Sequence, residues 1–122
     1  MDIGSILVFI AVVAAERLVE YALEKFVRIT RRTILEWFEK LLESWLNKIK
    51  CFFGKPYLNQ EDYLLVTVKI ELQGRESVIV QGIFNKNIRD FAEVRVLEYE
   101  SLDSQVSNAH RRQKVVIWND PS

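Results

Sequence analysis

The chain has 122 residues and carries 17 basic and 17 acidic side chains, so its formal net charge is zero. This balance argues against a nucleic-acid duplex as partner, because duplex binding usually needs a basic excess. A single cysteine and a single histidine exclude an intramolecular disulfide and every metal site that requires several thiols or several imidazoles. The length fits one domain with an accessory element.

The N-terminus is the most apolar part of the chain. Residues 3–15 are thirteen consecutive apolar or small residues without a proline, and they predict a helix that continues to about Phe26. Thirteen helical residues rise about 20 Å, less than the roughly 30 Å of a bilayer's hydrocarbon core. Over residues 16–27, a helical wheel places the charged side chains on one side and the apolar ones on the other.

We interpret residues 1–29 as a membrane-anchor helix that associates with copies of itself and turns its charged stripe inward. The residues expected at its membrane and oligomer faces are Ile6, Phe9, Ile10, Val13, Glu16, Arg17 and Glu20. Basic residues occur only downstream of the apolar run, which predicts a single-pass cell-membrane protein with its N-terminus outside. A helix buried in the core of a soluble oligomer and a cleaved signal peptide are the other interpretations.

A second helix is predicted over residues 33–53, followed by a linker over residues 54–61. Thr33 and Glu36 fit the N-cap and third positions of a capping box. Apolar residues then recur at alternating spacings of three and four and form a heptad-like seam: Leu35, Phe38, Leu42, Trp45, Ile49 and Phe52. The seam predicts an amphipathic assembly helix that packs on its own domain, on a neighbouring subunit or on the membrane surface.

Residues 62–120 are predicted to form a cytoplasmic α+β module. Apolar and polar residues alternate from Leu64 to Leu72, and a second strand that ends near Phe84 completes a hairpin. The opposite face of this hairpin carries Leu65, Ile79 and Ile83, and we expect the second helix or another subunit to cover it.

The rest of the module supplies two more strands and a helix. Residues 93–100 predict a third strand, Ser101 is expected to cap a short helix, and residues 114–118 predict a final strand. The resulting β-β-β-α-β order indicates a small, mostly antiparallel sheet with one helix across a face.

No motif for nucleophilic, nucleotide-dependent or metal-dependent catalysis is present, so we expect a protein that is not an enzyme and that has no cofactor or metal. The one concentration of candidate ligand residues comprises Arg95, His110, Arg111, Arg112 and Lys114. Basic residues at the end of a helix also complement its dipole, which is a purely structural interpretation. The functional interpretation is a site for a small phosphate or nucleotide, or a patch for an acidic partner.

The leading hypothesis is a single-pass, membrane-anchored, oligomeric scaffold whose small cytoplasmic module binds a protein partner. One alternative is an oligomeric membrane effector, pore-forming or membrane-perturbing, that a ligand or partner at the C-terminal module gates. The other is a soluble oligomer with the N-terminal helix buried in its core. All three include self-association, and they differ in where the N-terminal helix lies.

Overall fold

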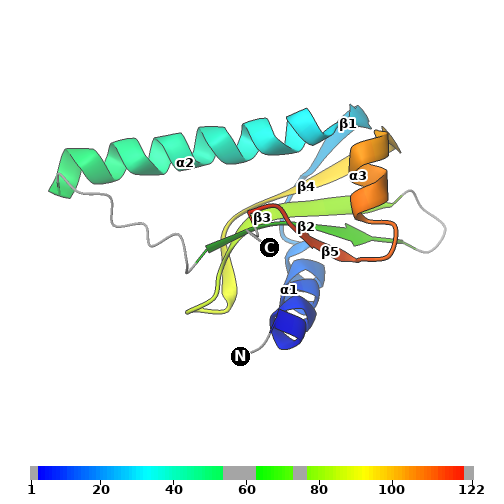
Figure 1. Cartoon of the computed structure of the whole chain (residues 1–122), viewed down its shortest axis with the longest axis horizontal. Helices are drawn as coiled ribbons and strands as arrows, with labels where there is room; N and C mark the ends of the chain where they lie inside the picture. Colours follow the sequence, from blue (N-terminus) through cyan, green and yellow to red (C-terminus); the bar gives the residue numbers. More distant parts are fainter. Residues whose placement is uncertain (1–2, 54–62, 73–76, 120–122) are drawn as a thin grey trace.

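The computed structural model is an α+β fold built on a five-stranded sheet (Figure 1). It describes the backbone of residues 3–53, 63–72 and 77–119, and the side chains of these residues except 3 and 45–53. The helices are α1 (Ile3–Arg17), α2 (Arg31–Phe53) and α3 (Ser104–Ala109). The strands are β1 (Leu23–Ile29), β2 (Tyr63–Ile70), β3 (Val78–Asn85), β4 (Asp90–Leu102) and β5 (Val115–Ile117).

The strands lie in the order β1-β4-β3-β2-β5. The β1–β4 pair is parallel and the other three pairs are antiparallel. The predicted hairpin is confirmed, since Leu64 lies opposite Phe84 and Ile70 opposite Val78. The predicted β-β-β-α-β order is confirmed as β2, β3, β4, α3 and β5. β1 adds to this sheet a strand that the sequence does not predict.

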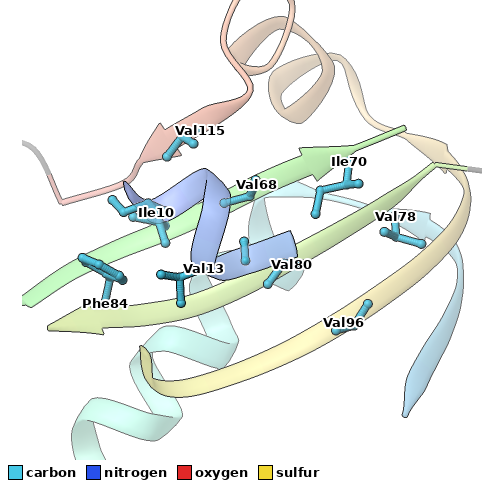
Figure 2. Packing of buried hydrophobic residues seen from close by; sticks show 11 residues of the cluster. Ile10, Val13, Val68, Ile70, Val78, Val80, Phe84, Val96 and Val115 are labelled. Carbon is cyan, nitrogen blue, oxygen red and sulfur yellow. The ribbon is translucent and has the colours of Figure 1, made fainter. Parts of the chain in front are cut away.

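α1 packs on one face of the sheet (Figures 1 and 2). The alternation of β2 explains this contact, because Val66 and Val68 point to the same face and are fully buried there. Figure 2 shows Ile10 and Val13 of α1 over the strand residues that they contact. The buried members of this first core cluster are Ile10, Val13, Ala14, Val66, Val68, Ile70, Val78, Val80, Phe84, Val96 and Val115.

α2 and α3 pack on the opposite face of the sheet. Ile34 and Phe38 of α2 are buried there against Ile79 and Ile83 of β3, with Val106 of α3 in the same second core cluster. The expectation that the second helix covers this face of the hairpin is therefore confirmed. The far end of α2 extends beyond the sheet (Figure 1).

The first helix is much shorter than predicted. α1 ends at Arg17, and residues 23–29, which were expected to be helical, form β1. Leu23 pairs with Val96 of β4. In this segment, backbone hydrogen bonds between strands therefore replace those that a helix would form within itself. The predicted continuation to Phe26 is wrong, because pairing with a distant strand overrides the helical pattern of this segment. Among the described residues, no helix combines the length and the apolar character needed to cross a bilayer.

Two helix caps also differ from the prediction. α2 begins two residues earlier, and the Thr30 hydroxyl oxygen accepts a hydrogen bond from the Thr33 backbone N–H at 3.1 Å. α3 is capped by Asp103 and not by Ser101, which lies in β4. The Asp103 carboxylate also accepts a hydrogen bond from the Arg31 backbone N–H at 3.0 Å, so it joins the start of α2 to the start of α3.

Candidate functional site

α1 has one buried face and one exposed apolar face. On its outer side Val8 is 65% exposed, Val12 is 52% exposed and Phe9 is 38% exposed. Positions 8 and 12 are about one helical turn apart, so the three side chains form a single ridge, which we call the α1 ridge. The α1 ridge therefore gathers three large apolar side chains on one exposed face of the helix.

The residues predicted for the membrane and oligomer faces divide between these two sides of α1. Ile10 and Val13 are buried in the first core cluster, and Ile6 is partly buried against it. Phe9 belongs to the α1 ridge, and Glu16 is exposed about one turn beyond Val12. The apolar run therefore supplies both the interior of the domain and its exposed ridge.

Arg17 ends α1 and is held by two carboxylates. Its Nε and Nη2 atoms donate to the Asp90 carboxylate at 3.2 and 2.6 Å, and Nη1 donates to Glu20 at 2.9 Å. The hydrogen bonds from Arg17 are the main reason that the pKa of the Asp90 carboxyl lies below its usual value. The predicted polar residues Arg17 and Glu20 are thus engaged within the chain, where they fix the end of α1 to the start of β4.

Cationic side chains flank the α1 ridge. The Arg89 guanidinium lies 5.3 Å from the centre of the Phe9 ring. Towards β5, a groove of about 500 Å³ is lined by Val8 together with Arg112 and Lys114. All three cations are exposed. Arg89 also has a φ of 54°, a left-handed conformation that a glycine would adopt at lower cost.

Three residues of the predicted anion site come together at the end of α3. His110, Arg111 and Lys114 line a polar hollow of about 580 Å³, and Lys69 and Glu71 also contribute to its lining. Arg111, Lys114 and Lys69 form no ion pair with another described residue. The hollow therefore has the charge to hold a small anion such as phosphate. The fourth predicted residue, Arg112, lines the groove beside α1 instead.

Arg95 does not join this group. Its guanidinium lies on the α2 side of the sheet, 4.8 Å from the centre of the Trp37 ring, and Nε donates to the Gln81 side-chain oxygen at 2.9 Å. Glu24 is 3.8 Å away. The Gln81 amide in turn donates to the Ile34 carbonyl of α2 at 2.8 Å. Arg95 and Gln81 are therefore part of the contact between the sheet and α2.

His110 is buried in a chain of hydrogen bonds. Its Nδ1 atom lies 3.1 Å from the Gln113 carbonyl oxygen, which can only accept, so Nδ1 carries the proton. Nε2 then accepts from the Thr67 hydroxyl at 2.8 Å, and that hydroxyl oxygen accepts from the Trp118 indole N–H at 2.8 Å. This arrangement suits a neutral imidazole, and burial lowers the pKa of His110 below its ordinary value.

We expect the free energy of unfolding to fall when the pH is lowered from about 7.5 to about 5.5, by up to about 1 kcal/mol. The unfolded chain binds a proton at the ordinary histidine pKa, whereas folded His110 resists protonation, so acid favours unfolding. His110 is the only histidine of the chain, and the lowered pKa of Asp90 acts only in more acidic solution. Urea titrations of the wild type and of His110→Asn measure the effect. An equal pH dependence in both proteins would contradict it.

The heptad-like seam of α2 is only partly described. Phe38 is buried in the second core cluster, Leu42 packs partly against it, and Leu35 is half-buried. Trp45, Ile49 and Phe52 lie outside the side chains that the structure describes, and the linker over residues 54–61 lies outside the described residues altogether. The fully buried partner of Phe38 on this helix is Ile34, one residue before the predicted start of the seam.

Two residues near the candidate surfaces were not predicted. Lys69 occupies a polar position of an alternating strand, and such a position indicates only solvent exposure. Arg89 lies in the turn before β4, where the sequence gives no sign that Phe9 is near. Both positions depend on packing between segments that are distant in the chain, so no local signal could have identified them.

No family model, curated protein or solved structure matches this chain. Within the part of the chain that the structure describes, no three His, Cys, Asp or Glu residues are grouped so that they could hold a metal ion.

Proposed function

We propose that this chain is a non-catalytic interaction module that docks on an anionic membrane surface through the α1 ridge. The observation that supports this is the exposure of Val8, Phe9 and Val12 on a helix whose other face belongs to the core. Such a ridge can enter the boundary between lipid headgroups and acyl chains while the opposite face of the helix stays packed on the sheet. The proposal keeps the membrane scaffold of the leading hypothesis and replaces the single-pass anchor with a surface contact.

The core contacts of α1 favour a surface contact over insertion of the whole helix. Insertion would remove Ile10, Val13 and Ala14 from the first core cluster and break the ion pair between Arg17 and Asp90. Burying one large aliphatic side chain contributes roughly 1.5–3 kcal/mol, and a domain is stable by only about 5–15 kcal/mol. Docking through the α1 ridge leaves all of these contacts in place.

The size of the α1 ridge favours lipid over a second protein surface. A helix of 15 residues is about 22 Å long and on the order of 10 Å wide, so one face offers roughly 200 Å². Stable protein interfaces bury about 800 Å² on each partner. A lipid interface requires no complementary shape, and it can take up a narrow convex ridge.

The charges around the α1 ridge match an anionic lipid surface. Arg89 stands on one side of it, and Arg112 and Lys114 line the groove on the other. Each cation near such a surface contributes about 1 kcal/mol, and the three partly exposed apolar side chains together contribute a similar few kcal/mol. Together, the contributions of the cations and the apolar side chains correspond to reversible membrane binding, comparable in strength to that of a single acyl chain.

Replacing Val8 and Val12 with aspartate is expected to lower the partition coefficient onto anionic vesicles by at least about tenfold, because the ridge then carries charge into the interface. Co-sedimentation of the full chain with vesicles of phosphatidylcholine and phosphatidylglycerol measures this coefficient. Binding should be weaker on pure phosphatidylcholine and at high salt, since the cations contribute.

Ser104→Asp with Gln105→Asp provides a control with the same change in charge. Both residues are exposed on α3, on the opposite side of the sheet from α1. This variant should keep most of the vesicle binding. If the wild type stays in the supernatant, or if both variants lose binding equally, the α1 ridge is not the membrane contact.

A further inference from the structure

β1 lies at the edge of the sheet, and no described strand pairs with its outer side. It pairs only with β4 among the described strands, and all its residues except Phe26 and Ile29 are exposed. Leu23 is 46% exposed and Val27 is 73% exposed. Alternate backbone N–H and C=O groups of an edge strand point away from the sheet, where they can pair with another strand.

We propose that β1 pairs antiparallel with β1 of a second copy and joins the two sheets into one. In such a symmetric pair a two-fold axis stands perpendicular to the sheet. Residues opposite each other on antiparallel strands point to the same face, so one residue of β1 must lie opposite its own copy. The allowed registers therefore differ only in which residue lies at the axis.

The charges of β1 select one of these registers. With Phe26 at the axis, Glu24 lies opposite Arg28 of the second copy, and symmetry repeats this pair. With Glu24, Lys25 or Arg28 at the axis, like charges lie opposite each other, which is destabilising. With Val27 at the axis, the position opposite Glu24 falls outside β1 of the second copy, so Glu24 has no charged partner there. An axis at either end of β1 leaves almost no residues paired.

The surroundings of β1 are compatible with this register. The Glu24 side chain is 53% exposed and only 3.8 Å from Arg95, so it can accept a second cation from the solvent side. In the same register Lys25 lies opposite Val27 of the second copy, so no like charges face each other. α2 starts directly after β1 but packs inward over β3, so it does not cover the free edge.

Charge exchange on β1 tests the proposal in solution, without lipid and therefore independently of the proposed function. Sedimentation velocity of the full chain over a range of concentrations should show a monomer–dimer equilibrium. Glu24→Arg alone and Arg28→Glu alone should each raise the dissociation constant by at least about tenfold, because like charges then oppose each other twice. Mixing the two variants should restore dimers, since every opposed charge pair in the mixed dimer is then unlike.

The controls separate this surface from other modes of association. Glu39→Arg makes the same change in charge at an exposed position of α2, and it should leave the dissociation constant unchanged. Circular dichroism should show the same fold in all variants. The proposal is overturned if the wild type is monomeric at every concentration, if either β1 variant dimerises like the wild type, or if the mixture associates no better than its components.

Discussion

Gly82→Ala is expected to lower the free energy of unfolding by about 3 kcal/mol or more. A Cβ atom at position 82 would lie 2.5 Å from a ring carbon of Phe91 and 2.7 Å from the Glu93 carbonyl oxygen. The ring could move only by giving up its edge-to-face contact with Phe84, and the carbonyl oxygen belongs to the backbone of β4. Urea unfolding followed by circular dichroism measures the loss.

A double-mutant cycle with Phe91→Ala tests this explanation. Removing the ring relieves one of the two clashes, so the double variant should be more stable than the sum of the two single effects predicts. Strictly additive effects would show that the Phe91 ring does not cause the loss. Recovery should remain incomplete, because the clash with the Glu93 carbonyl persists.

Phe38→Ala is expected to cost about 3–5 kcal/mol of stability. Phe38 is 2% exposed and is the largest side chain that α2 buries against the sheet among the described residues. Its truncation leaves a cavity beside Ile79 and Ile83, because the rigid strand residues cannot collapse into the space. The same urea titration measures the change, and tryptophan emission should report it through the nearby Trp37.

Ile34→Ala and Leu35→Ala provide the comparison that distinguishes the observed buried face of α2 from the predicted seam. Ile34 is fully buried, so its truncation should cost about 2–5 kcal/mol. Leu35 is half-buried, and its truncation should cost about 1 kcal/mol. A larger loss at Leu35 than at Ile34 would mean that the helix packs through the predicted seam.

The strands of the hairpin could be predicted from the sequence because their patterns are local. Alternation in β2 identified the face that α1 covers, and the apolar residues on the other side, including Ile79 and Ile83, indicated a second covering layer. Both signals have a period of two and need no knowledge of the rest of the chain. The fold class followed from them.

β1 could not be predicted, because its partner is far away in sequence. The segment from Leu23 to Ile29 mixes charged and apolar residues. Their order is compatible with an amphipathic helix and also with an edge strand. Pairing with β4 decides between these structures, and no pattern within the segment predicts that pairing. The membrane interpretation of residues 16–27 depended on the helical choice.

The candidate sites also divide into residues that a local sequence pattern predicts and residues whose position depends on the fold. The cluster at the end of α3 was visible in sequence because His110 and Arg111 are neighbours in the chain. The sequence predicts that Arg95 joins this cluster from a neighbouring strand, but its side chain lies on the α2 face, beside Gln81 and Trp37. Proximity of strands does not determine which face a side chain occupies unless the register is known.

The packing of α1 has a consequence for how the chain folds during synthesis. Its end is held by Asp90, 73 residues later, and its inner face contacts strands as late as β5. The ribosome therefore releases the apolar residues of α1 before the strands that cover them. Contacts between such distant segments make folding slow, and exposed apolar surface promotes aggregation meanwhile. A chaperone or a lipid surface that shelters residues 3–15 until β5 emerges would raise the yield of folded protein.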